Sequence, residues 1–143
     1  YVHSIVALNE ALEDGFDEAL MLDADGYVAE GSGENFFIVK ENILYSPDLD
    51  SCLDGITRRT ILELADELGI PYEIKKLNIE DVFEADESFF SGTAAEVVPI
   101  NSLDNQPIGK GSRGPLTEKL QSIYFDQVRG ARKKNINWHT LVE

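Results

Sequence analysis

The sequence has few of the residues that build disulfide or metal sites. Its 143 residues include one cysteine, Cys52, which excludes an internal disulfide framework and is consistent with a reducing, cytoplasmic compartment. The two histidines, His3 and His139, are far apart, and without a second cysteine they offer too few ligands for a zinc site. We therefore expect neither a disulfide scaffold nor a bound metal.

The chain also lacks long apolar runs and has little positive charge. No apolar run approaches the roughly 18 residues that a membrane-spanning helix needs. Against 12 basic residues there are 27 acidic ones, so the formal net charge is −15. Because such a surface repels phosphate backbones, we expect no nucleic-acid partner. The lack of a spanning apolar run leads us to expect no membrane partner.

The remaining composition is that of one ordinary globular domain, with 43% apolar and 27% charged residues. Apolar residues recur with helical spacing over 3–14, 57–68, 79–83 and 115–128. Short runs typical of strands lie between these helices, at 19–22, 27–29, 35–40, 43–45, 71–74, 87–90 and 97–100, the last continuing to 102–103 past a proline. Helices that alternate with mixed strands predict an α/β or α+β fold.

Residues 26–37 read Gly-Tyr-Val-Ala-Glu-Gly-Ser-Gly-Glu-Asn-Phe-Phe, which places two carboxylates beside a Gly-x-Gly turn. Acidic side chains are disfavoured in strands, so we expect Glu30 or Glu34 to face something other than water. The alternative is that both lie at a solvated strand end.

A second candidate site is the helix start at Leu-Asp-Gly-Ile-Thr-Arg-Arg, residues 53–59. The first amides of a helix lack partners, so those of Ile56 and Thr57, with the Thr57 hydroxyl, could hold a phosphate. Arg58 and Arg59 oppose the helix dipole in this first turn, and a bound anion would relieve that conflict. The alternative is that Gly55 only turns the chain and Thr57 caps the helix.

A third candidate is Ser-Gly-Thr-Ala-Ala-Glu, residues 91–96, where small residues follow an apolar strand. The amides of Thr93 and Ala94, with the Thr93 hydroxyl, could form a second anion-binding nest. The alternative is a tight corner between two strands.

A ligand with a phosphate at one end and a basic ring nitrogen at the other would use all three features. Pyridoxal phosphate is such a ligand, because its ring nitrogen needs an acidic partner to stay protonated. Its amino acid substrate would bring a carboxylate to the second nest.

These three motifs, in this order and spacing, closely resemble those of the branched-chain amino acid aminotransferases. The resemblance runs from Tyr1 to about Gly130, nearly the whole chain. It implies the α+β fold of the large domain of fold type IV pyridoxal-phosphate enzymes, a mixed-sheet pseudo-barrel with flanking helices. Residues 1–130 would form this cofactor-binding domain and residues 131–143 a C-terminal tail.

The resemblance also implies a role for each matching residue. Glu30 would pair with the pyridinium nitrogen, and Tyr1 would lie near the ring oxygen of the cofactor. Ile56, Thr57 and Thr93 would bind the cofactor phosphate. The amides of Thr93 and Ala94 would bind the substrate carboxylate, and Glu34 and Arg58 would support neighbouring residues.

In the same family the Schiff-base lysine would lie a few residues before the position of Tyr1. The lysines of this sequence lie outside the three motifs, so we expect no catalytic residue within it. The sequence therefore resembles an N-terminally truncated large domain, which we expect to be inactive alone.

For the intact parent, the resemblance implies transfer of an amino group from leucine, isoleucine or valine to 2-oxoglutarate, in a homodimer. D-amino acid aminotransferases and aminodeoxychorismate lyases share the Glu-Gly and Gly-Ile-Thr-Arg elements and are the alternatives within the enzyme class. A second class of alternative is a non-catalytic phosphate-binding or interaction module that keeps the motifs only as architecture.

Overall fold

The computed structural model describes residues 2–139 and confirms a mixed α+β fold. The strands are β1 Leu20–Leu22, β2 Val28–Gly31, β3 Asn35–Lys40, β4 Ile43–Ser46, β5 Tyr72–Ile74, β6 Glu87–Gly92, β7 Glu96–Pro99, β8 Ser102–Leu103 and β9 Gln106–Pro107. The helices are α1 Val2–Glu13, α2 Ile56–Glu67, α3 Ile79–Phe83 and α4 Pro115–Val128, followed by a 3₁₀ turn at Ile136–Trp138.

Strand β3 is the centre of the seven-stranded sheet. One of its edges pairs antiparallel with β6 over five positions, from Asn35 opposite Ser91 to Val39 opposite Glu87. Its other edge pairs with β2 at Asn35 and with β4 from Ile38 to Lys40. Since β4 and β5 pair in parallel around α2, the sheet is mixed.

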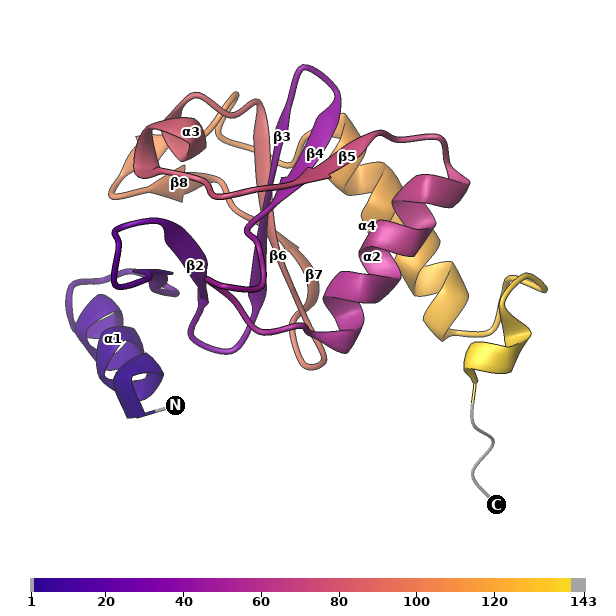
Figure 1. The fold of residues 1–143 in the computed structure, drawn as a ribbon, viewed down its shortest axis with the longest axis horizontal. Helices are drawn as coiled ribbons and strands as arrows, with labels where there is room; N and C mark the ends of the chain where they lie inside the picture. The colour runs from indigo at the N-terminus through magenta and orange to yellow at the C-terminus, as the bar shows by residue number, and fades with distance from the viewer. Residues whose placement is uncertain (1, 140–143) are drawn as a thin grey trace.

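The alternating side chains of β3 and β6 divide the core between the two faces of the sheet. Phe37 and Phe89 stack with ring centroids 4.8 Å apart and pack against α2 and α4. Phe36 and Phe90 point to the opposite face, toward α3 and the β8–β9 hairpin. Figure 1 shows α2 and α4 together on one side of the sheet, with α1, α3 and β8 on the other.

The apolar positions that predict α2 and α4 all pack in the first of these clusters. They are Ile61, Leu62, Leu64, Ala65 and Leu68 in α2 and its C-cap, and Leu116, Leu120, Ile123 and Tyr124 in α4. The helical spacing therefore identifies both the helices and the faces that they bury.

The expected strand through 97–103 is wrong, because the chain changes sheets there. Strand β7 ends at Pro99, and β8 pairs only with β9 in a separate two-stranded sheet. Asp104 and Asn105, at φ 49° and 64°, form the two-residue turn between β8 and β9. This turn needs positive φ at both central residues, which asparagine and aspartate tolerate.

At the starts of helices α3 and α4, side chains accept hydrogen bonds from the first main-chain amides. At α3, the Asn78 side chain accepts from the Asp81 amide at 2.9 Å, and the Asp81 side chain accepts from the Asn78 amide at 2.9 Å. At α4, the buried carboxylate of Glu87 accepts from the amides of Leu116 at 3.2 Å and Thr117 at 2.8 Å. These pairings leave α2 as the contrasting case.

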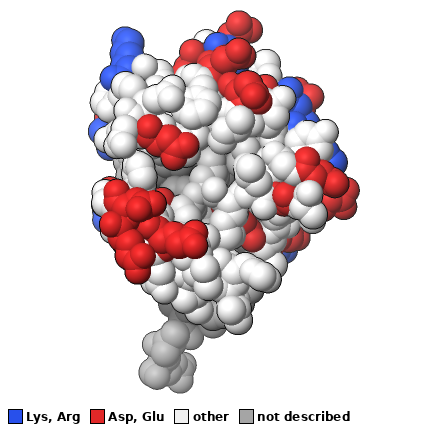
Figure 2. Space-filling model, turned by 90° about the vertical axis from the view of Figure 1, so that its left-hand side faces the viewer, with Lys and Arg blue, Asp and Glu red and all other residues white. Residues whose placement is uncertain are grey.

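Among the described residues, no helix is long and apolar enough to cross a membrane. The same residues contain no group of three or more potential ligands that could hold a metal ion. The face toward α1 and α3 carries many more acidic than basic side chains (Figure 2).

Candidate functional site

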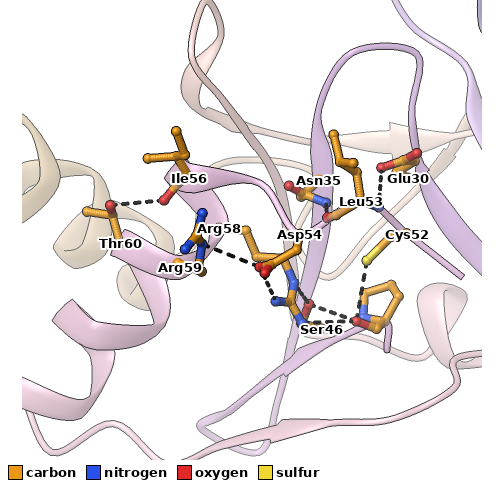
Figure 3. Close-up of polar contacts among 11 residues, drawn as sticks. Glu30, Asn35, Ser46, Cys52, Leu53, Asp54, Ile56, Arg58, Arg59 and Thr60 are labelled. Atoms are coloured by element: carbon orange, nitrogen blue, oxygen red, sulfur yellow. Dashed lines mark hydrogen bonds and ion pairs between the residues drawn. The ribbon is translucent and has the colours of Figure 1, made fainter. Parts of the chain in front are cut away.

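The carboxylate of Glu30 is held at the end of β2 by the turn that precedes α2. Its Oε2 accepts a hydrogen bond from the Leu53 amide at 3.1 Å. Within residues 2–139, its Oε1 accepts no hydrogen bond. Glu30 therefore has one anchored oxygen and one that can meet a ligand (Figure 3).

Asn35 joins the three motifs. Asn35 belongs to the first motif and pairs with Glu30 of β2 and with Ser91 of β6, so it connects the first motif to the third. Its side-chain amide donates to the Leu53 carbonyl at 2.7 Å, which fixes the turn before α2. A Cβ at Gly55 would collide with the Asn35 Oδ1, so only glycine allows this close approach.

The start of α2 is open. Its N-cap is Gly55, no side chain caps it, and its first turn contains no acidic residue. The alternative in which Thr57 caps the helix is wrong, because Thr57 lies inside the first turn, where it is 6% exposed. Ile56, the first residue of the helix, is 73% exposed, so an anion could approach the helix start from its side.

The two arginines of this turn behave differently. Arg58 is 2% exposed, and its guanidinium donates to the Ser46 hydroxyl at 3.0 Å and to the Pro47 carbonyl at 3.3 Å. Arg59 is exposed and lies 3.5 Å from the Asp54 carboxylate, which also lies 3.7 Å from Arg58. Arg58 thus ties α2 to the end of β4 (Figure 3).

The third motif is the corner between β6 and β7. Thr93 and Ala94 form its exposed tip. Gly92 packs against the first motif, since a Cβ there would lie 3.2 Å from the Gly33 carbonyl oxygen. The alternative for this segment is a tight corner between two strands, and the chain does turn here. Because Gly92 contacts Gly33, the amides of this corner lie beside the Glu30 hairpin.

The hydroxyl of Ser91 is fully buried and has no hydrogen-bond partner among the described residues. Ser91 shares the face of the sheet with Asn35 and Phe89, toward α2. An unpaired buried hydroxyl is costly, which makes this part of the site polar and unsatisfied.

Glu34 lies at the other side of the turn and faces a second acid, Glu18. Burial raises the pKa of Glu34 to about 7, and its hydrogen bond to Glu18 and the Glu18 charge act in the same direction. Burial also raises the pKa of Glu18, but hydrogen bonds from Ser32 and from the Ala19 amide outweigh it and leave that pKa lowered.

The structure thus brings Glu30, the α2 start and the β6–β7 corner together, as the hypothesis of one ligand requires. Tyr1 lies outside the described residues. Sequence reasoning gave no role to Asn35 or Glu18. A polar residue opening an apolar strand was a signal for Asn35, whereas nothing in the sequence marks Glu18 as the partner of Glu34.

A family model of amino-transferase class IV matches residues 1–103. The chain therefore belongs to the class IV aminotransferase family, in agreement with its three motifs.

Within the family, the chain is similar to branched-chain-amino-acid aminotransferases. The chain is 54% identical over 143 residues to the branched-chain-amino-acid aminotransferase of Pseudomonas aeruginosa, covering 100% of the chain and 47% of that protein. It is 41% identical over 139 residues to that of Escherichia coli K12, covering 96% and 45%. The chain thus spans about half the length of the curated relatives it matches.

The fold matches solved structures equally well. The branched-chain amino acid aminotransferase from T.th., complexed with N-(5'-phosphopyridoxyl)-L-glutamate, aligns with a TM-score of 0.98 at 43% identity, over 100% of this chain and 49% of that one. The enzyme from Thermoproteus uzoniensis with norvaline aligns with a TM-score of 0.94 at 46% identity, over 98% and 46%.

Proposed function

We propose that the protein carrying this chain transfers amino groups between branched-chain amino acids and 2-oxoglutarate, with pyridoxal phosphate as cofactor. The described relatives are branched-chain aminotransferases, and one aligned structure holds a phosphopyridoxyl amino acid. Residues 1–130 would supply the large, cofactor-binding domain. The proposed partners are small amino and 2-oxo acids, in a cytoplasmic homodimer, as the resemblance implies.

The observation that carries this proposal is the position of Asn35. One residue contacts the Glu30 strand, the Gly55 turn and the strand that leads to Gly92. A carboxylate and two sets of main-chain donors therefore lie around one point. The donor set fits a ligand with an anionic group at one end and a protonated nitrogen at the other.

The phosphate would lie at the open start of α2. The amides of Ile56 and Thr57, the Thr57 hydroxyl and Thr93 would donate to it, and the positive end of the helix dipole would favour its charge. Arg58 would not touch the phosphate, because its guanidinium is engaged with Ser46 and Pro47. It would instead hold the helix start in place.

At the other end of the site, Glu30 would meet the ring nitrogen through Oε1 and keep a proton on it. When bound, pyridoxal phosphate supplies a ring that stabilises negative charge beside the reacting carbon of the amino acid. Tyr1 would lie near the ring oxygen. The amides of Thr93 and Ala94 would orient the substrate by its carboxylate, and Glu34 would orient the turn beside Glu30.

The test is Glu30→Gln in the full-length protein, assayed with leucine and 2-oxoglutarate. We expect kcat to fall by about 100-fold or more, since a neutral amide cannot stabilise the proton on the ring nitrogen as the carboxylate does. Circular dichroism should show an unchanged fold. Glu63→Gln, an exposed change on α2, is the matched control. Undiminished turnover by Glu30→Gln would refute the role of Glu30. A preference of the native protein for D-amino acids over leucine would refute the proposed substrate class.

A further inference from the structure

The main-chain groups of Leu53 connect the two ends of the proposed cofactor site. Its amide donates to Glu30 Oε2 at 3.1 Å. Its carbonyl accepts from the Asn35 side-chain amide at 2.7 Å and from the amide of Gly55, the N-cap of α2, at 2.9 Å. Leu53 therefore lies between the carboxylate of Glu30 and the open start of α2 (Figure 3).

Leu53 is held by these main-chain hydrogen bonds and not by the packing of its side chain. That side chain is 72% exposed, and residues 53–55 belong to no helix or strand. Asn35, by contrast, is 6% exposed and lies in β3, where it pairs with Glu30 of β2 and with Ser91 of β6. The amide of Asn35 thus ties a segment without regular structure to the centre of the sheet.

The Asn35 side chain fits this place in one orientation. Its nitrogen faces the Leu53 carbonyl, because a carbonyl can only accept. Its Oδ1 then lies against Gly55, where a Cβ would collide with it. An aspartate would set an acceptor against the carbonyl, and an apolar side chain would leave that carbonyl with the Gly55 amide alone. The arrangement therefore uses both the shape and the donor of the asparagine amide.

Glu30 depends on Leu53 for the orientation of its carboxylate. A glutamate side chain rotates about several bonds, and within residues 2–139 the Leu53 amide is the one hydrogen-bond donor to this carboxylate. A functional group of this kind has to stay within about 0.5 Å of its working position. If Leu53 moves, Oε2 loses its donor and Oε1 loses its direction.

We propose that Asn35 is a positioning residue for the cofactor: through the main chain of Leu53 it holds the Glu30 carboxylate so that Oε1 faces the ring nitrogen. This role rests on the proposed function, in which Glu30 keeps a proton on that nitrogen. In this role Asn35 acts through Leu53 and not by touching the cofactor.

The first experiment tests the contact in the full-length protein without cofactor. Hydrogen exchange, read by mass spectrometry in peptides that contain Leu53, compares the native protein with Asn35→Leu, which keeps a side chain of similar size but has no donor. We expect exchange at Leu53 to be about tenfold faster in Asn35→Leu. Asn78→Ala, which also removes a side-chain hydrogen bond to the main chain, but at α3, is the matched control and should leave this exchange unchanged. Equal exchange in Asn35→Leu and the native protein would overturn the link to Leu53.

The second experiment observes the ring nitrogen. The full-length protein is loaded with pyridoxal phosphate that is isotopically labelled at this nitrogen, whose magnetic resonance shift reports its protonation. We expect a protonated nitrogen in the native protein and in Asn78→Ala, and an unprotonated one in Glu30→Gln. Asn35→Leu should move the shift toward the unprotonated value, because its Glu30 carboxylate is no longer held. A shift in Asn35→Leu equal to the native one would overturn the positioning role.

A double-mutant cycle separates positioning from general destabilisation. Asn35→Leu should lower kcat by about tenfold in the native background but by less than about twofold in Glu30→Gln, where no carboxylate is left to orient. Equal losses in the two backgrounds would contradict the proposal. Asn35→Ala, which is smaller and also has no donor, takes the place of Asn35→Leu in all three experiments if the latter fails to fold.

Failure of the proposed function would look different. A native protein that binds no pyridoxal phosphate, or a ring nitrogen that Glu30→Gln leaves unchanged, would refute the proposed function and with it the role of Asn35 toward the cofactor. A protonation that depends on Glu30 but not on Asn35 would refute the role of Asn35 alone.

Discussion

Helices α2 and α4 both begin after a glycine, Gly55 and Gly114, yet their first amides have different surroundings. In α4 a carboxylate from the sheet, Glu87, accepts from the Leu116 and Thr117 amides. In α2 no side chain caps the start, and the first turn carries arginines. At α4, where we propose no ligand, the chain itself supplies the anion at the helix start, the carboxylate of Glu87.

The same comparison extends to α3, which closes its start with a capping box from Asn78 and Asp81. A carboxylate does stand before α2, that of Asp54, but it pairs with Arg58 and Arg59 and does not cap the helix. The open start of α2 is therefore best understood as a place for an anion from outside the chain, and it supports the phosphate position proposed above.

The largest expected effect tests the closed helix start. Glu87→Ala removes the acceptor of two α4 amides at a buried position, so we expect a loss of about 2–4 kcal/mol in the free energy of unfolding. Glu118→Ala, an exposed change in the same first turn, should alter stability by at most about 0.5 kcal/mol. Urea denaturation of both variants decides this, and equal effects would break the comparison.

An intermediate effect is expected at α3. Asn78→Ala removes one half of the capping box and should cost about 1 kcal/mol. Thermal unfolding monitored by circular dichroism gives the value. A loss as large as that of Glu87→Ala would mean that the exposed and buried helix starts do not differ as proposed.

The smallest effect is expected at the open start. Arg59→Gln removes an exposed ion pair with Asp54 but also a cation that opposes the helix dipole, so these terms offset each other. We expect a change within about 0.5 kcal/mol in urea denaturation. A loss above about 1 kcal/mol would show that the first-turn arginine stabilises α2 by itself, and the contrast with α4 would weaken.

Local patterns were sufficient to predict α2, α4 and the hairpin strands, because their side chains repeat with the period of the element. The same patterns did not predict that the chain leaves the main sheet after Pro99. That depends on partners: Ile100 still donates to the Ser88 carbonyl of β6, whereas Ser102 and Leu103 pair with β9 instead of the main sheet. Strand pairing is a long-range choice that periodicity does not encode.

The candidate site shows the same limit. The three motifs could be recognised one by one, and their chemistry suggested one ligand. Their meeting point, Asn35, and the contact between Glu18 and Glu34 depend on how distant segments pack. A side chain that holds two loops together has no periodic signal, so its role emerges only from the folded arrangement.

The pairing of β3 with both β2 and β6 has a consequence for biosynthesis. A nascent chain that has left the ribosome only as far as β5 can form the β2–β3–β4–β5 part of the sheet, but one edge of β3 stays bare. Until β6 is synthesised and pairs with it, this unpaired edge can form hydrogen bonds with strands of other chains. The candidate site, which needs the β6–β7 corner, is therefore completed late, and this interval is when a chaperone would be most useful.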